Sequence, residues 1–264
     1  MPATRCIFRR KYKYLRFVPD FLFGRGRGEP PIRIFALGSV SGDFRPKRQA
    51  PEPFSDPRQK TMSQFAVVTG GTKGIGRAVV WRFAQAGFDV ATCARNEENL
   101  RQTQADFAAD FPQRRLYCQP ADLSQRTQVD AFAAFVNGLG RPADVLVNNT
   151  GFFIPGQIHN EPDGTLEAQM AANVYSAYHL TRALLPGMMR RRDGHIFNLC
   201  SIASIMAYPN GGSYSISKFA LYGMTKVLRA ELQDHGIRVT AVLPGATLTA
   251  SWEGTDLPPD RFMR

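Results

Sequence analysis

The sequence predicts a single α/β domain built on a doubly wound parallel sheet. Two observations carry this prediction: apolar runs alternate with helix-forming stretches from Gln64 to Pro244, and a glycine-rich turn joins the first apolar run to the first helical stretch. Strands that alternate with helices indicate a parallel sheet, because a parallel pair needs a long crossover connection. The 264 residues are enough to bury one core of good size.

The first strand and the turn after it predict a phosphate site. The apolar run 65–68 is followed by TGGTKGIG at 69–76, and a helical stretch covers 75–86. Glycine lets the backbone come close to a pyrophosphate, and a helix N-terminus offers unpaired N–H donors and the positive end of a dipole. The glycine spacing differs from the G-x-G-x-x-G order, so an ordinary strand-to-helix turn is the alternative. A dinucleotide bound here would contact Gly70, Thr72, Lys73, Gly74, Ile75 and Gly76.

The second strand, expected over 88–93, bears on which dinucleotide is bound. An acidic side chain after this strand would hold the ribose 2′-hydroxyl. This chain has Ala94 and Arg95 there instead. A guanidinium pairs with a 2′-phosphate, and Lys73 adds a second positive charge, so we expect NADP(H) rather than NAD. The alternative is that Arg95 is a solvated loop residue.

Tyr214 and Lys218 form the candidate catalytic pair. They stand four residues apart at the start of a helical stretch that runs to Leu232, and side chains at that spacing share one helix face. A free tyrosine has a pKa of about 10, and a fixed cation nearby lowers it. The pair therefore predicts a general acid and base for the interconversion of a carbonyl and an alcohol. Two unconnected surface residues are the alternative.

Further motifs follow the later strands in order. Asn148-Asn149-Thr150-Gly151 comes after an apolar run at 145–147, and Asn173 lies in a helical stretch over 166–185. Ser201 follows a strand at 195–200, and the motif 244–249 follows a strand at 237–243. With TGGTKGIG and the Tyr214–Lys218 pair, this set resembles the short-chain dehydrogenase/reductase family over about residues 64 to 249. Within the family, the chain is compared with 3-oxoacyl-carrier-protein reductases. Thr150 and Thr247 depart from the usual pattern, which has Ala and an aliphatic residue there.

The resemblance implies a Rossmann fold and a role for each matched residue. Tyr214 would donate the proton to the substrate oxygen, and Ser201 would hydrogen-bond the substrate carbonyl. Lys218 would hold the nicotinamide ribose and lower the tyrosine pKa, and Asn173 would hold a water of a proton relay. Asp122 would meet the adenine ring, and Thr249 would reach the nicotinamide carboxamide. The remaining cofactor contacts implied are Leu123, Asn148, Asn149, Gly151, Pro244 and Gly245, with Tyr214 and Lys218 also touching the cofactor.

We therefore expect an NADPH-dependent short-chain oxidoreductase that reduces an apolar ketone or a 3-oxoacyl compound. The alternative is a non-catalytic scaffold or sensor that binds NADP. The apolar residues expected at the substrate pocket are Phe152, Phe153, Ile154, Ile205, Met206, Tyr208 and Trp252. The helical stretches 166–185 and 214–232 each carry an apolar stripe, and in the family such helices pair between subunits, so we expect a homodimer or homotetramer.

Charge and cysteine usage exclude other classes. The formal charge of +11 is concentrated in residues 1–61, which hold 14 of the 33 Lys and Arg but 5 of the 22 Asp and Glu. The rest of the chain gives no reason to expect a nucleic-acid partner. No apolar run reaches 18 residues, and the four cysteines have no paired or metal-binding spacing. We therefore expect no membrane span, no metal site and a cytoplasmic location.

Both ends differ from the expected family pattern. Residues 1–61 are basic and rich in Pro, Gly and Arg, which is typical of disorder, and Met62 lies where such domains begin. We interpret them as an extension from an upstream start, with a targeting presequence or a basic arm for RNA or anionic lipid as alternatives. The domain would cover 62–264. Because the chain ends 20 residues after Pro244, we expect the last helix and strand of the fold to be missing.

Overall fold

The structure is a computed structural model that describes residues 63–245. Its centre is a six-stranded sheet in the order β3-β2-β1-β4-β5-β6, in which every neighbouring pair is parallel. The strands are β1 (Phe65–Thr69), β2 (Asp89–Ala94), β3 (Leu116–Pro120), β4 (Val145–Asn148), β5 (Gly194–Leu199) and β6 (Ile237–Val242). This order is that of a doubly wound Rossmann sheet, so the predicted fold class is confirmed.

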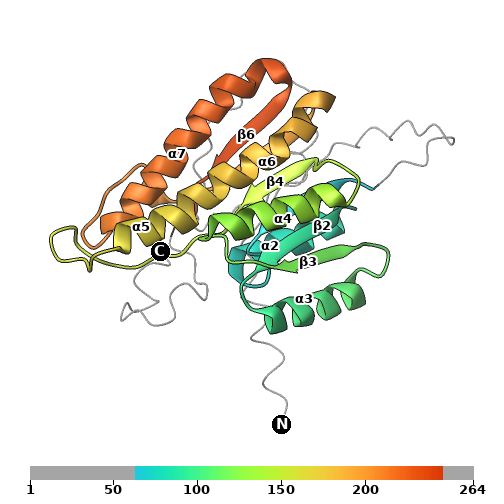
Figure 1. The fold of residues 1–264 in the computed structure, drawn as a ribbon, viewed down its shortest axis with the longest axis horizontal. Coiled ribbons are helices and arrows are strands. Elements are labelled where there is room, and N and C mark those ends of the chain that lie inside the picture. Colours follow the sequence, from blue (N-terminus) through green and yellow to red (C-terminus); the bar gives the residue numbers. More distant parts are fainter. Residues whose placement is uncertain (1–62, 246–264) are drawn as a thin grey trace, which may run out of the picture.

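Helices cover both faces of the sheet (Figure 1). One layer contains α2 (Gly74–Gln85) and α3 (Glu97–Asp110), and the other contains α4 (Arg126–Gly138), α6 (Ser176–Arg191) and α7 (Gly212–Leu232). The shorter helical segments are α5 (Thr165–Met170), η2 (Ala171–Tyr175), η3 (Ile202–Ser204) and η4 (Gln233–His235). With helices on both faces, the central strands are apolar almost throughout, and all five residues of β1 are buried.

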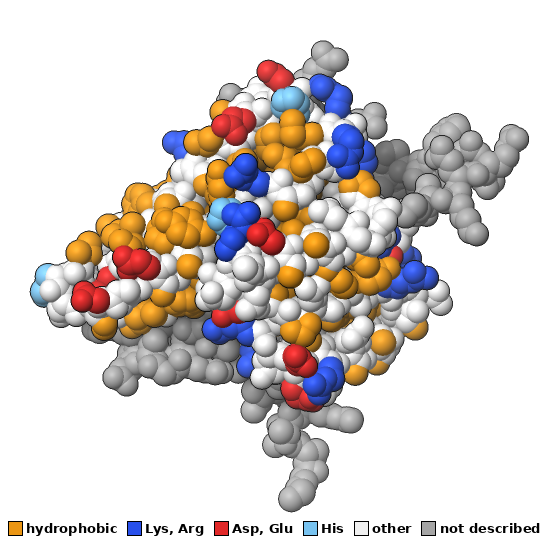
Figure 2. Space-filling model, in the orientation of Figure 1, with side chains coloured by type: hydrophobic (Ala, Val, Ile, Leu, Met, Phe, Trp, Pro, Cys, Tyr) orange, Lys and Arg blue, Asp and Glu red, His pale blue; other side chains and the backbone are white. Residues whose placement is uncertain are grey.

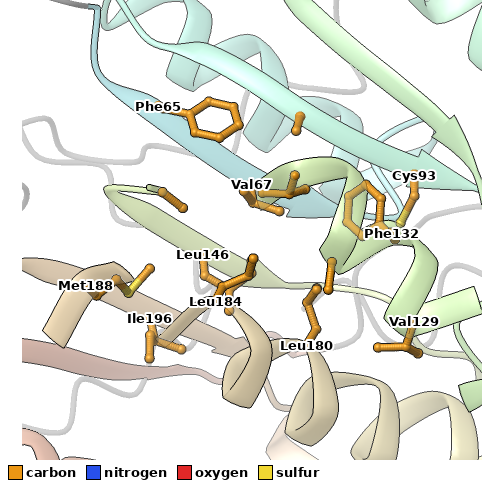
Figure 3. Close-up of a cluster of buried hydrophobic side chains, with 14 of the residues drawn as sticks. Phe65, Val67, Cys93, Val129, Phe132, Leu146, Leu180, Leu184, Met188 and Ile196 are labelled. Carbon is orange, nitrogen blue, oxygen red and sulfur yellow. The ribbon is translucent and has the colours of Figure 1, made fainter. Parts of the chain in front are cut away.

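The main core lies between the sheet and the α4–α6 layer (Figure 3). Strand residues Phe65, Leu146 and Ile196 are buried there with Phe132 of α4 and Leu180 of α6. Each such side chain contributes about 1.5–3 kcal/mol relative to an exposed position. This packing fixes the strands, and therefore fixes the turns that leave their carboxyl ends.

The helix predicted over 166–185 differs from the one observed. The structure has α5, then a π-helical turn over Ala171–Tyr175, then α6 to Arg191. Pro186 lies inside α6 and removes one helical hydrogen bond, but its neighbours Leu184 and Met188 are buried in the core. Tertiary packing therefore carries the helix past the residue at which a sequence pattern would end it.

Several predictions fall outside the described residues. The extension 1–61, Thr249 and Trp252 are among them, as is any element beyond Gly245. Within 63–245, no helix is both long and apolar enough to span a membrane. That same part of the chain contains no cluster of three His, Cys, Asp or Glu side chains suited to a metal ion.

Candidate active site

The candidate site lies at the carboxyl edge of the sheet, where the strand order reverses between β1 and β4. The glycine turn leaves the end of β1, the Asn148–Gly151 motif leaves β4, and Ser201 follows β5. Because the strands are parallel, their carboxyl ends meet at one edge of the sheet. Open α/β sheets bind ligands in the crevice formed at such a switch point.

The glycine turn is closed tightly and leaves no room for side chains. Gly70 has a φ of +67° and Gly74 a φ of +52°, a region that favours glycine. A Cβ at Gly76 would overlap the carbonyl oxygen of Gly70 and lie 2.5 Å from the Asn149 side-chain nitrogen. These glycines let the backbone fold back on itself before α2 begins.

Side chains from β2 and the β4 motif hold the turn in place. The Asn149 Nδ2 donates to the carbonyl oxygen of Thr69 at 2.8 Å, and the backbone N–H groups of Asn149 and Thr150 each donate to Thr69 Oγ1 at 2.9 Å. The N–H of Gly71 donates to Thr92 Oγ1 at 3.0 Å. Lys73 is the N-cap of α2, and its side chain does not cap the N–H groups of the first helical turn. This cradle fits the pyrophosphate of a dinucleotide.

Arg95 and Lys73, the residues predicted to bind a 2′-phosphate, both lie close to the ends of strands at the site's edge of the sheet. Arg95 directly follows β2, and both Arg95 and Lys73 are exposed. Neither forms an ion pair with any residue of the described part. Asp122 accepts hydrogen bonds from the backbone and side chain of Ser124, and the side chain of Leu123 is buried in the core. Asp122 therefore fixes the turn after β3, and Leu123 contributes packing.

Tyr214, Ser201 and Lys218 are brought together at the start of α7. Ser201 lies beside Tyr214 and lowers the pKa of its phenol, and the Lys218 Nζ lies 5.7 Å from the centroid of the Tyr214 ring. Lys218 Nζ donates to the carbonyl oxygen of Leu199 at the end of β5, at 2.8 Å. The ring of Phe153 packs edge-on against Tyr214, with 4.8 Å between centroids. Ser201 also caps η3, where its hydroxyl accepts from the N–H of Ala203.

Burial dominates the protonation of both catalytic candidates. It raises the pKa of Tyr214, against the opposite effect of the neighbouring Ser201 hydroxyl. It lowers the pKa of Lys218 to about 8, since a buried ammonium loses its hydration. The expected lowering of the tyrosine pKa by Lys218 is therefore not found. Lys218 is not among the groups that shift the pKa of Tyr214, and its ammonium is directed to a backbone carbonyl.

Asn173 lies in the π-helical turn and is fully buried. Its side chain accepts from the N–H of Phe152 at 2.9 Å and donates to the carbonyl oxygen of Phe152 at 3.1 Å and to Ser217 Oγ at 2.9 Å. A Cβ on Gly151 would lie 2.6 Å from Asn173 Oδ1 and 3.5 Å from Lys218 Nζ, so these three residues are adjacent. Single π-turns are frequent at functional sites. Here the turn directs an amide at the segment that leaves β4.

The sequence missed several residues that shape this site. Thr69 and Thr92 fix the glycine turn, and Glu161 contacts Ser213, the residue before Tyr214. No motif marks Glu161, since it lies in a loop 52 residues from its partner. Pro244 accepts a hydrogen bond from Ile202 through its carbonyl oxygen, which ties the last described residues to the segment after Ser201.

The fold and this edge define a doubly wound α/β protein with a glycine cradle and, next to each other, a half-buried tyrosine and a buried lysine. A family model described as "short chain dehydrogenase" matches residues 64–257. The chain belongs to the short-chain dehydrogenase family, whose matching members are named dehydrogenases and oxidoreductases. The predicted family is thus confirmed, whereas the finer resemblance to 3-oxoacyl-carrier-protein reductases stays a prediction.

Three relatives illustrate the similarity. A 3alpha-hydroxysteroid dehydrogenase from Mediterraneibacter gnavus is 33% identical over 187 residues, which cover 71% of this chain and 75% of the relative. A crystal structure of a metagenomic short-chain oxidoreductase in complex with NADP has 35% identity and a TM-score of 0.64, covering 69% of this chain and 82% of that one. A short-chain dehydrogenase from Streptomyces avermitilis has 33% identity and a TM-score of 0.66, covering 70% of this chain and 66% of that one. The chain thus spans just under two thirds of the Streptomyces avermitilis protein.

Proposed function

We propose that this protein is an NADPH-dependent reductase that interconverts a carbonyl and an alcohol. One observation carries the proposal: Tyr214, the Ser201 hydroxyl that lowers its pKa and the buried Lys218 lie at the same sheet edge as the glycine cradle. A half-buried phenol with a raised pKa keeps its proton at neutral pH, which suits a donor to the oxygen of a carbonyl under reduction. The nicotinamide would supply the hydride.

The residues of the site then have distinct tasks. Tyr214 holds the transferable proton on its hydroxyl, and Ser201 orients that hydroxyl and the substrate oxygen. Lys218 is the cation beside the tyrosine ring, and it would bind the ribose. Asn173 orders the segment at Phe152 and is proposed to support a proton relay from Lys218. The proposed cofactor contacts are Gly70, Thr72, Lys73, Gly74, Ile75, Gly76, Arg95, Asp122, Leu123, Asn149, Gly151, Pro244, Gly245 and Thr249.

The choice of NADPH rests on Arg95 and Lys73. Both are exposed cations: Lys73 is the N-cap of α2, and Arg95 directly follows β2, where an acid would favour NAD. The metagenomic relative was solved with NADP, which supports this choice. For the substrate, we propose an apolar ketone, because apolar side chains are exposed on the two segments beside Tyr214. They are Ile154 and Ile158 after β4, and Ile205, Met206 and Tyr208 after η3. The relative named for a hydroxysteroid supports an apolar substrate.

The test compares the wild type with Tyr214→Phe, which keeps the ring packed on Phe153 and removes only the hydroxyl. We expect reduction of a panel of ketones to fall by about 10²–10⁴-fold. Stabilisation by NADPH should remain, at about 2.7 kcal/mol when its concentration is a hundred times the dissociation constant, and should exceed that by NADH. Tyr222→Phe, the same change two turns along α7, is the control and should leave turnover unchanged.

Three outcomes decide the proposal. Turnover by Tyr214→Phe at the wild-type rate would remove Tyr214 from the reaction. A wild type that is stabilised by NADPH but reduces no ketone would favour the alternative, a scaffold or sensor that binds NADP. Equal stabilisation by NADH would reject the assignment of Arg95.

A further inference from the structure

The helix that carries Tyr214 begins without a capping side chain of its own. Its N-cap is Gly211, which has no side chain, and no acidic residue lies in the first turn of α7. The first four N–H groups of a helix have no partner inside the helix, and an uncapped first turn frays. Tyr214 is the third residue of α7, so its position depends on whether this turn is held.

Glu161 supplies the missing cap from a distant loop. Its carboxylate accepts the backbone N–H of Ser213 at 2.9 Å and also the hydroxyl of Ser213. A carboxylate at a helix N-terminus is favoured by the helix dipole, and hydrogen bonds to a charged acceptor are about twice as strong as neutral ones. Ser213 is 3% exposed, so these bonds are sheltered from water.

The backbone around Glu161 is joined to the same turn. The N–H of Gly156 donates to the carbonyl oxygen of Asn210 at 3.1 Å, and Gly156 pairs with Gly211 as an isolated parallel bridge. The Gln157 side chain donates to Asn210 Oδ1 at 2.9 Å. We call this set of contacts between 156–161 and 210–213 the Glu161 clasp.

Two glycines make the close approach possible. A Cβ on Gly156 would lie 2.6 Å from the Cγ of Glu161, and a Cβ on Gly212 would overlap the Glu161 carboxylate. Gly212 also has a φ of +28°, which side chains rarely adopt. The clasp is therefore a specific fit between the loop after β4 and the start of α7.

We propose that Glu161 is a positioning residue for Tyr214: the clasp fixes the first turn of α7 against the loop that carries Phe153, and so sets where the tyrosine hydroxyl points. This inference rests on the proposed function, in which that hydroxyl donates the proton. The same loop meets the site twice more, through Phe153 on the Tyr214 ring and through Phe152 on Asn173. Small misplacements of a reacting group cost large factors in rate.

Glu161 acts through placement rather than through its charge. The pKa of Tyr214 is shifted by its own burial and by two groups, Ser201 and Cys200. Tyr214 in turn raises the pKa of Tyr208. Lys218 is a further ionisable group beside the Tyr214 ring. Glu161 is not among the groups that shift the pKa of Tyr214, so its removal should alter the tyrosine by loosening the turn and admitting water.

The test compares Glu161→Ala, Glu161→Gln and a control, Asp144→Asn. Asp144 is also a carboxylate that accepts a backbone N–H, that of Phe65 at 2.6 Å, but it lies at the amino end of β4 and far from the site's edge. We expect Glu161→Ala to lower kcat by about tenfold or more while the dissociation constant of NADPH stays within about twofold. Glu161→Gln should recover most of the rate, because an amide can accept from the Ser213 N–H and donate to its hydroxyl. Asp144→Asn should lower thermal stability and leave kcat unchanged.

A second readout needs no turnover. With ¹³C-labelled tyrosine and Tyr214→Phe to assign the signal, the titration of Tyr214 should move in Glu161→Ala from its raised pKa toward about 10, and stay in place in Asp144→Asn. An unmoved titration in Glu161→Ala would overturn the clasp even if the wild type reduces no ketone. A shifted titration with no reductase activity in the wild type would reject the proposed function alone. Wild-type kcat in Glu161→Ala would overturn the positioning role.

Discussion

The shape of the glycine cradle depends on the absence of a side chain at Gly76. A Cβ there would overlap the carbonyl oxygen of Gly70 and press on the Asn149 amide that holds the turn. Both neighbours are fixed, one as backbone and the other by two hydrogen bonds. Neither can move aside without opening the cradle.

We therefore predict that Gly76→Ala destabilises the protein by about 1–3 kcal/mol, the usual cost of overpacking, and lowers NADPH affinity at least tenfold. Thermal unfolding with and without NADPH measures both effects. Gly138→Ala is the matched control, because a Cβ at Gly138 meets nothing within 4 Å at the end of α4. Unchanged NADPH stabilisation in Gly76→Ala would show that the cradle does not hold the cofactor.

At this scale the sequence predicted residues that belong to motifs and missed residues that belong to loops. Tyr214 and Lys218 lie next to each other, as their four-residue spacing on a helix predicts, and their catalytic roles stay predictions. Asn149 was found by its motif, and its two hydrogen bonds to the glycine turn explain why an amide stands there. Glu161 could not be found, since its contact with Ser213 depends on how a loop returns across the fold.

At the scale of elements, His195 joins β5 to β6. Its Nε2 lies 2.8 Å from Thr240 Oγ1, and its ring stacks on Phe197 at 3.9 Å. Burial, with Arg238 and Arg229 nearby, lowers the pKa of His195 to about 3. A histidine buried in the neutral form contributes stability above its unfolded pKa of about 6.5, and this contribution is lost as the pH falls toward 3.

We predict that the free energy of unfolding falls by about 2 kcal/mol between pH 8 and pH 5 through this group alone. Urea unfolding across that range measures the fall. His195→Gln keeps a polar side chain for Thr240. In this variant the free energy of unfolding should depend less steeply on pH, because about one proton fewer is taken up on unfolding than in the wild type. Parallel curves for the two proteins would contradict the assignment of this proton to His195.

The helix that contains Asn173 shows what local patterns omit. Helical periodicity predicted a stretch over 166–185, and the structure has a helix broken by the π-turn and continued past Pro186. The π-turn adds a residue to the helical register and directs the Asn173 amide at Phe152. Its cause is tertiary, because that amide is satisfied by Phe152, 21 residues away, and by Ser217, 44 residues away.

At the scale of the whole molecule, the order of strands and helices was predictable because each crossover is local and parallel strands follow from it. The distribution of side chains on the surface was less predictable from the sequence. Exposed apolar side chains gather over α5 and the neighbouring parts of α6 and α7 (Figure 2). Tyr175, in the π-turn, is 51% exposed and Tyr178, on α6, is 43% exposed. On α7, Phe219 is 44% and Val227 55% exposed.

Contiguous apolar surface of this kind marks interaction sites, and we propose that it pairs with a second copy of the chain, as the apolar stripes predicted. A stable dimer buries about 1,200–2,000 Å² in total, which two helical faces can provide. We predict that Phe219→Glu lowers the mass measured by sedimentation velocity from that of an oligomer to that of a single chain. Pairing would bury an unpaired carboxylate, and the free-energy cost of that burial exceeds what the remaining contacts contribute. Ala108→Glu, an exposed position on α3 in the opposite layer, should leave the mass unchanged. A wild type that sediments as a single chain would leave this face for another partner and reject the pairing.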